Sequence, residues 1–150
     1  MTTIRAIRTP ENDDMLQIQR GIEEFAQAFR AKDLKRVIAG YAPEIVAFNM
    51  MPPLKYVGLQ AWEKLWETSL SQMDGEISLE MKNLNIEVSG KLAVAHGLSH
   101  FTMHGSNEAD IWMRWTGVFH KINNKWLVVH EHTSVPTDME SGKALPDLKP

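Results

Sequence analysis

The chain has 150 residues and a formal net charge of -3, with 43% hydrophobic and 23% charged residues. This balance suits one domain with a sizeable core, and it argues against disorder and against general nucleic-acid binding, which usually needs a basic surface. The absence of cysteine excludes disulfides, thiol catalysis and thiolate metal sites.

No stretch of the chain approaches the roughly 20 apolar residues that cross a bilayer. The segment Met1–Pro10 contains Arg5 and Arg8 but no apolar run, so it does not resemble a signal peptide. We therefore expect a cytoplasmic protein that has no membrane partner.

The first half of the chain has a helical pattern. Thr9 can cap a helix whose first turn contains Pro10, and apolar residues then recur at helical spacing: Ile18, Ile22, Phe25, Ala26 and Phe29. We predict one helix from Pro10 to near Lys32, a shorter one over 34–39 after the capping residue Asp33, and a third over 59–70. Between the last two, the pattern predicts a turn over 41–44, a short strand over 45–48 and a loop at Pro52-Pro53.

After Gly75 the apolar residues alternate with polar ones, which is typical of strands. The alternation over 77–81 continues over 84–88, and we predict further strands over 92–103, 109–120 and 126–135, with turns at 89–90, 104–107 and 123–124 and a loosely held tail over 137–150. Helices followed by antiparallel strands predict an α+β domain, in which a strongly curved, mostly antiparallel sheet wraps around the helices and encloses a pocket. No repeat or linker suggests a second domain, so 1–150 is expected to be one domain with a core over about 11–136.

Several sequence blocks resemble the SnoaL-like polyketide cyclases and ketosteroid isomerase homologues of the nuclear transport factor 2-like superfamily: Lys32–Leu34, Tyr41–Glu44, Gly58, Gly117–Phe119 and Asn123–Ser134. The last block also resembles the association domain of calcium/calmodulin-dependent kinase. The resemblance covers about residues 11–136 and implies a single, cone-like SnoaL-like domain. It does not imply one function, because this fold hosts isomerases, dehydratases, hydrolases, cyclases and assembly domains.

The resemblance to ketosteroid isomerase argues against that particular reaction. Ketosteroid isomerase uses an aspartate base, with a tyrosine and a protonated aspartate as hydrogen-bond donors. The base position aligns with Asn49, whose amide cannot accept a proton at neutral pH, and the tyrosine position aligns with Phe25. The second aspartate aligns near Thr116 or Gly117. We therefore treat Asn49 and Phe25 as ligand-binding residues and expect no steroid isomerisation by this mechanism.

The hairpin at Asn123-Asn124 decides which residues of the last two strands face the pocket. A tight two-residue turn would set Gly117 opposite His130 and Trp115 opposite His132, whereas a bulged three-residue turn would set them opposite Val129 and Glu131. A shift of one residue in the pairing of these two strands turns the side chains of one strand to the opposite face of the sheet. The resemblance favours the bulged turn, which predicts a pocket lined by Trp115, Gly117, Glu131 and Thr133.

Glu131 and two histidines are the candidate catalytic residues. Burial would raise the pKa of Glu131 and suit it to acid–base work, although a salt bridge to an arginine is an equal alternative. His96 and His100 share one sheet face, and the hairpin over 104–107 is predicted to place them beside Gly117 and Met113 in the pocket. They could instead be structural or interface histidines.

The opposite, convex face is predicted to carry Arg114, Thr116, His130 and His132. It mixes polar and apolar groups as interfaces do, with Arg114, His120, Trp126 and Val128 as expected contacts of a homodimer.

We therefore predict a protein that binds a small apolar or amphipathic ligand, with Trp62, Trp115, Phe25 and methionines as the apolar wall. Trp62 could equally be a core residue. The protein is expected to be a small-molecule binding protein or a lyase- or isomerase-type enzyme, with no cofactor and no metal site. A protonated His96 would tolerate an anionic ligand end, whereas a charged Glu131 alone would repel it. The alternative is a non-catalytic ligand-binding or oligomerisation module.

Overall fold

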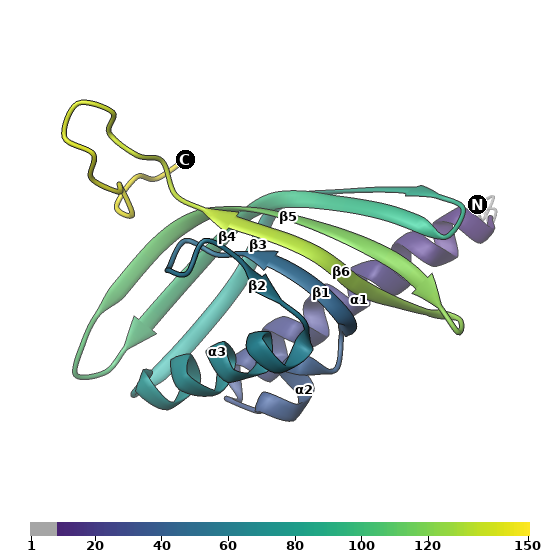
Figure 1. The fold of residues 1–150 in the computed structure, drawn as a ribbon, viewed down its shortest axis with the longest axis horizontal. Helices are drawn as coiled ribbons and strands as arrows, with labels where there is room; N and C mark the ends of the chain where they lie inside the picture. The colour runs from purple at the N-terminus through teal and green to yellow at the C-terminus, as the bar shows by residue number, and fades with distance from the viewer. Residues whose placement is uncertain (1–8) are drawn as a thin grey trace, which may run out of the picture.

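The computed structural model describes residues 9–150, so Met1–Arg8 of the segment assessed for a signal peptide lies outside the described residues. Three helices, α1 (Pro10–Arg30), α2 (Leu34–Ile38) and α3 (Leu59–Gln72), lie against one face of a curved six-stranded sheet (Figure 1). The strands are β1 (Tyr41–Phe48), β2 (Tyr56–Val57), β3 (Glu76–Ser89), β4 (Leu92–His104), β5 (Ala109–Ile122) and β6 (Lys125–Ser134). Their order in the sheet is β2-β1-β6-β5-β4-β3. The fold class is α+β, as the sequence predicted.

The two predicted helix caps are present. The Thr9 hydroxyl accepts a hydrogen bond from the Asn12 amide at 3.2 Å, and the Asp33 carboxylate accepts one from the Arg36 amide at 3.2 Å. Each side chain thereby satisfies an amide that the first helical turn leaves without a partner.

The sheet departs from the prediction at its parallel edge. The segment Tyr41–Glu44 is not a turn but the start of β1, because Tyr41 pairs in parallel with Val128 of β6. The pairing is irregular between Tyr41 and Val46, which accommodates Pro43 within the strand. Strand β2 was not predicted, since its two residues are too few to show alternation.

The β5–β6 hairpin has a register that neither predicted turn gives. Asn123 and Asn124 form a tight turn with positive φ values of 49° and 61°, so Ile122 pairs with Lys125. A bulge then lies farther along β6, because Phe119 pairs with Val128 whereas Val118 pairs with His130.

The bulge changes which side chains of β6 face the helices. Beyond it, Gly117 pairs with Glu131 and Trp115 with Thr133, so these four residues share the inner face. Before it, Trp126 and Val128 also line the inner side. The prediction that Trp126 and Val128 lie on the convex face was therefore wrong, because the turn at Asn123-Asn124 is tight and the extra residue comes only after Val128.

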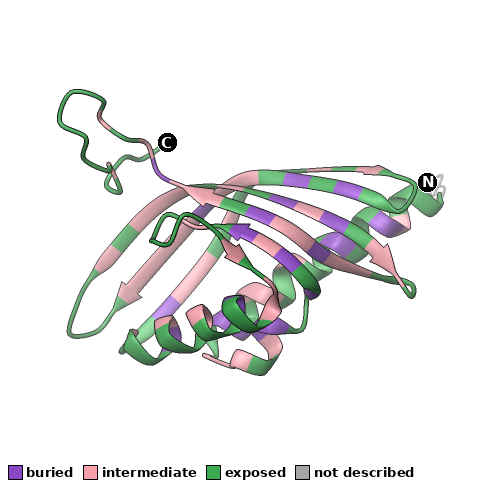
Figure 2. Cartoon of the chain, viewed as in Figure 1, coloured by how far each residue is buried: buried purple, intermediate pink, exposed green. Residues whose placement is uncertain are grey.

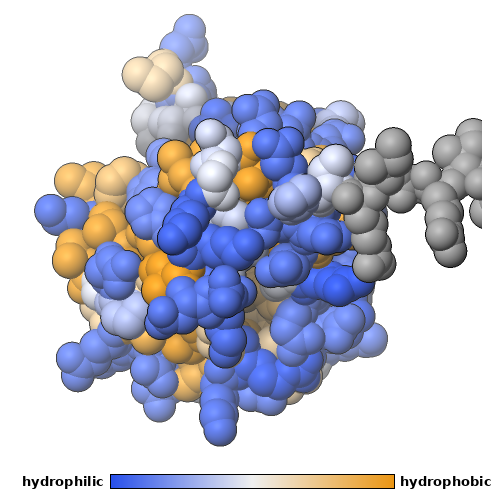
Figure 3. Space-filling model, turned by 90° about the vertical axis from the view of Figure 1, so that its right-hand side faces the viewer, coloured by the Kyte–Doolittle hydropathy of each residue, from blue (hydrophilic) through white to orange (hydrophobic). Residues whose placement is uncertain are grey.

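Buried residues gather where α1 and α3 cover the inner sheet face (Figure 2). The largest fully buried side chains are Trp62, Phe29, Ile18, Ile45, Ile77 and Val37. The face seen in Figure 3 is mostly hydrophilic, and hydrophobic side chains reach the surface mainly on the left of this view.

The segment after β6 leaves the end of the sheet and folds back on itself (Figure 1). Thr137 pairs with Ala144, and the Leu145 amide donates a hydrogen bond to the Pro136 carbonyl at 2.8 Å. Within residues 9–150, no helix combines the length and the apolar character needed to cross a membrane.

Candidate functional site

A cavity of about 470 Å³ lies between the inner sheet face and the helices. Its wall is mostly apolar and aromatic: Phe25, Phe29, Leu65, Trp66, Leu79, Met81, Phe101, Ile111, Met113, Trp115, Phe119, Trp126 and Val128. This size and polarity are typical of sites for small organic ligands. Few polar side chains reach this wall, so each of them is informative.

Glu131 is the ionisable group that β6 presents to the cavity. Only 6% of the residue is exposed, and its carboxyl group is held by two donors from different strands. The Tyr41 hydroxyl donates to Oε1 at 3.0 Å, and the Trp115 indole Nε1–H donates to Oε2 at 3.0 Å. Burial raises the pKa of Glu131, and the hydrogen bonds from Trp115 and Tyr41 oppose this rise without cancelling it.

The two donors determine where a proton on Glu131 can sit. An indole N–H can only donate, so the oxygen bound to Trp115 remains an acceptor in either protonation state. A proton on the carboxyl group is therefore favoured on Oε1, next to the Tyr41 hydroxyl, which can both donate and accept. The site thus holds one carboxyl oxygen fixed and leaves the other to exchange a proton.

Tyr41 is itself deeply buried. Burial raises the pKa of Tyr41, the charge of Glu131 raises it further, and the indole groups of Trp62 and Trp66 lower it. Within the described residues, those two buried indole N–H groups make no hydrogen bond of normal geometry. Tyr41 therefore stays a neutral O–H donor at neutral pH.

Gly117 makes room for the Trp115 ring. It lies opposite Glu131, and a Cβ atom at this position would fall 2.6 Å from the Trp115 ring and 3.2 Å from the Phe119 ring. A side chain here would displace the indole that donates to Glu131. Gly117 therefore supports the site through shape rather than chemistry.

The predicted histidine partners of Glu131 lie on the other side of the sheet. His96 pairs with Thr116 and His100 with Trp112, so both face outward, and the prediction that they share the pocket was wrong. The β4–β5 connection leaves the five residues 104–108 between the paired Met103 and Ala109. The predicted turn over 104–107 had four residues. One more residue in the turn shifts the pairing of the two strands by one position, and this moves His96 and His100 to the opposite face of the sheet from the predicted one.

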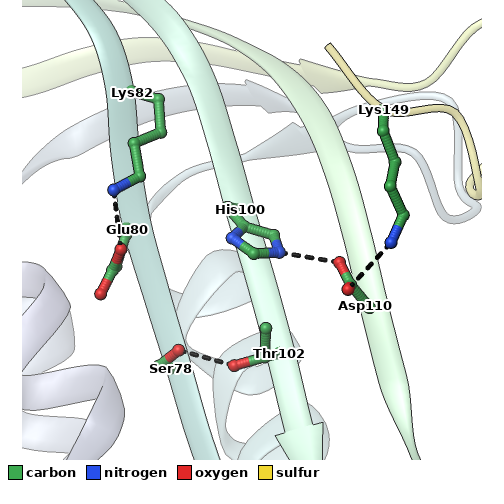
Figure 4. A network of polar contacts seen from close by, with 7 residues as sticks. All are labelled: Ser78, Glu80, Lys82, His100, Thr102, Asp110 and Lys149. Carbon is green, nitrogen blue, oxygen red and sulfur yellow. Dashed lines mark hydrogen bonds and ion pairs between the residues drawn. The ribbon is translucent and has the colours of Figure 1, made fainter.

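His100 belongs to a polar network on the outer face. Its Nε2 lies 2.7 Å from Asp110 Oδ1, and its ring stacks on Trp112 with 4.2 Å between centroids. Lys149 from the end of the chain contacts the other oxygen of Asp110 at 3.2 Å (Figure 4). His100 therefore contacts surface groups and not the cavity.

The remaining predicted ligand-binding residues divide into two groups. Phe25, Thr133 and Asn49 line the cavity, and the Asn49 side-chain oxygen accepts a hydrogen bond from the Met51 amide at 3.1 Å. Trp62 does not line the cavity but lies in the core, packed against Tyr41, Tyr56 and Trp66.

Sequence reasoning missed Tyr41, which was assigned to a turn, and Ser99, a buried hydroxyl on the inner face of β4. The alternation of side chains along β4 places Ser99 on the face opposite His96 and His100. The prediction put the two histidines inside, which left Ser99 outside. Within residues 9–150, no three histidine, aspartate or glutamate side chains come together as metal ligands do.

The raised pKa of Glu131 predicts a pH-dependent stability. Below about pH 4.5, the ordinary value for glutamate, both the folded and unfolded states hold the proton. As the pH rises above it, the unfolded state releases the proton first, so the free energy of unfolding falls until the pH passes the raised folded pKa. The fall is about 1.4 kcal/mol for each unit by which the pKa is raised.

Glu131→Gln removes this titration. Urea unfolding from pH 4 to 9 should show the wild-type protein losing stability relative to Glu131→Gln as the pH rises. Glu63→Gln, which changes an exposed glutamate of α3, should follow the wild type throughout. Parallel curves for wild type and Glu131→Gln would contradict a raised pKa.

Comparison with known proteins identifies relatives of the whole fold. A family model described as a SnoaL-like domain matches residues 18–138. A crystal structure of an NTF2-like protein of unknown function from Pseudomonas putida KT2440 is 37% identical, with a TM-score of 0.86 over 92% of this chain and 97% of that one. No curated protein matches the chain.

More distant structures share the fold alone. One, described as a candidate association domain of calcium/calmodulin-dependent protein kinase II from Xanthomonas campestris, is 19% identical, with a TM-score of 0.71 over 99% of both chains. Another, described as a candidate dehydratase of the NTF2-like family from Streptomyces avermitilis, is 13% identical, with a TM-score of 0.75 over 83% of this chain and 97% of that one.

Proposed function

Because the chain belongs to the SnoaL-like domain family of the NTF2-like superfamily, we propose that it binds a small, mostly apolar molecule and moves a proton on it with Glu131. The reaction would be of the lyase or isomerase type and would need no cofactor. The observation that carries this proposal is a buried carboxyl group with a raised pKa, held by Tyr41 and Trp115 in the wall of an apolar cavity. Such a group is suited to acid–base chemistry near neutral pH.

The proposed proton transfer uses the two carboxyl oxygens differently. In its ionised form, Oε1 of Glu131 takes a proton from a carbon next to a ligand carbonyl, and the C–H electrons move into the new enolate. Trp115 continues to donate to Oε2, which keeps the carboxyl group in place. Return of the proton to another carbon completes an isomerisation, and its transfer to a departing hydroxyl group releases water.

The elimination version has support from structural relatives. The proteins described as candidate dehydratases from Streptomyces avermitilis and, for scytalone, from Novosphingobium aromaticivorans share this fold. At 13% and 15% identity, they support the reaction class by analogy.

Steroid isomerisation through the positions of ketosteroid isomerase does not fit this site. Asn49 cannot act as a base and Phe25 has no hydroxyl group, as the alignment of the sequence already indicated. The Asn49 oxygen is moreover engaged by the Met51 amide. An assay with a β,γ-unsaturated ketosteroid checks this expectation directly.

Isotope exchange tests the proposed function without knowledge of the natural ligand. 4-Acetylbiphenyl is a neutral aromatic ketone whose methyl protons are weakly acidic. In D2O, proton NMR should show that the protein accelerates the loss of the methyl signal, and that Glu131→Gln does not.

The second candidate function is a non-catalytic assembly module. The composition of the outer sheet face supports a protein interface on that face. Apolar side chains lie half-exposed on this face among histidines and an arginine, including Phe48, Leu92 and Val94. Phe48 packs against His130 and His132, with ring centroids 4.8 and 5.6 Å apart. Mixed aromatic and polar surfaces of this kind are typical of protein interfaces.

We propose that two copies of the chain pair through this outer face. Phe48→Asp should then shift the mass measured by light scattering at micromolar concentration from dimer to monomer, because it places an unpaired charge in the interface. Leu54→Asp, at a loop residue that is 94% exposed, should leave the dimer intact. A monomeric wild-type protein at these concentrations would contradict the proposal.

A further inference from the structure

Ser99 is a further polar residue of the cavity wall, and nothing in the reaction proposed above uses it. It lies on the inner face of β4, opposite Met113, and is only 3% exposed. Its side chain makes no hydrogen bond with another group among residues 9–150, and the buried side-chain atoms without a partner there are the indole nitrogens of Trp62 and Trp66, so the Ser99 hydroxyl is open to the cavity and lacks a partner in it. A ligand in the cavity would supply that partner.

The distance between Ser99 and Glu131 sets the length of such a ligand. On β5, the partners of these two residues, Met113 and Gly117, are four positions apart. At about 3.3 Å per residue and about 4.8 Å between strands, the Cα atoms of Ser99 and Glu131 would be about 16 Å apart on a flat sheet. Because the sheet is curved and both side chains reach inward, their polar groups would be closer than this, and a molecule of two joined aromatic rings would suit such a gap.

The charges of the wall restrict the ligand further. Arg36 is the only basic residue of the cavity wall within the described chain, and it is already paired with Glu24. The guanidinium donates to Glu24 Oε1 from Nε at 2.8 Å and from Nη2 at 2.6 Å, at an exposed edge. An anionic group deep in the cavity would have no cation beside it and would lose its hydration.

We infer that the cavity takes a neutral, elongated aromatic or alicyclic molecule with a polar group at each end, one bound by Glu131 and the other by Ser99. This inference rests on the proposed function, since it assumes that the cavity binds ligands. It removes the alternative of an anionic end beside a protonated His96, because His96 and His100 face outward.

The two polar ends of the ligand and its lack of charge can be tested separately with three biphenyl probes. Their binding is measured by tryptophan fluorescence or calorimetry at pH 7. 4,4′-Dihydroxybiphenyl has two polar ends, 4-hydroxybiphenyl has one, and biphenyl-4-carboxylate has an anionic end. We expect the dihydroxy probe to bind about five- to tenfold more tightly than the monohydroxy probe, as one added hydrogen bond allows. The carboxylate should bind at least about tenfold more weakly than the monohydroxy probe.

The variants show whether Ser99 is responsible. Ser99→Ala should reduce the affinity for the dihydroxy probe to that of the monohydroxy probe and leave the latter unchanged. Thr116→Val removes a hydroxyl from the outer face and should change neither affinity. Equal binding of the carboxylate, or an unchanged dihydroxy affinity in Ser99→Ala, would overturn this inference alone. Failure of both phenols to bind would overturn the proposed function and this inference with it.

Discussion

Glu131→Gln is expected to slow the exchange of the 4-acetylbiphenyl methyl protons by about 100-fold or more, since a positioned general base contributes 10²- to 10⁴-fold. The amide is nearly the same size as the carboxyl group and can still accept the Trp115 hydrogen bond, so the fold and the cavity should persist. What is lost is the oxygen that accepts a proton. Exchange rates from proton NMR in D2O, measured at several pH values, give the comparison.

Two further variants identify the source of this effect. Tyr41→Phe removes one donor to Glu131 and should reduce exchange by a smaller factor while raising the pKa at which exchange begins. Glu63→Gln should exchange at the wild-type rate. A wild-type protein no faster than buffer, or a Glu131→Gln variant as fast as wild type, would show that Glu131 does not move protons in this cavity.

Trp62→Ala is expected to lower the free energy of unfolding by about 3–5 kcal/mol. Trp62 is 1% exposed and makes edge-to-face contacts with Tyr41, Tyr56 and Trp66, with centroids 6.0, 5.4 and 5.7 Å apart. Because its indole N–H has no normal hydrogen bond among the described residues, the loss comes from packing and the cavity left behind. Urea unfolding measures it.

Trp62→Phe and Leu54→Ala complete this comparison. Trp62→Phe should lose less stability and keep the affinity for 4-hydroxybiphenyl, because position 62 does not line the cavity. Leu54→Ala, at an exposed loop residue, should change stability by no more than about 0.5 kcal/mol. If Trp62→Ala abolished probe binding while costing less than about 1 kcal/mol, Trp62 would be a ligand contact, as one reading of the sequence suggested.

The helices and most strands follow from local patterns in the sequence. Thr9 and Asp33 have the side chains that cap helices, and the alternation after Gly75 is strong over long segments. The parallel pairing of β1 with β6 is different, because it joins residues more than 80 positions apart and leaves no local pattern. For that reason Tyr41, the hydroxyl donor to Glu131, was assigned to a turn.

The faces of the strands were harder to predict than the strands themselves. Glu131 and Trp115 share one face of the sheet only in some registers of β5 and β6. The tight turn at Asn123-Asn124 and the bulge at Val129 together give a register in which they do. At the β4–β5 connection, a single extra loop residue reversed the parity, moving His96 outward and Ser99 inward. Alternation fixes the spacing of side chains but not the length of a turn, so the sequence could not decide between the two faces.

The most direct measurement of the central claim is an NMR titration of the Glu131 side-chain carboxyl carbon, assigned by its absence in Glu131→Gln. The buried, two-donor site predicts an apparent pKa above 4.5, the ordinary value for glutamate. Addition of 4-hydroxybiphenyl should shift this resonance, because the phenol would contact the same carboxyl group. A pKa at or below 4.5, together with a resonance that the probe leaves unchanged, would contradict a protonatable carboxyl group at the ligand site.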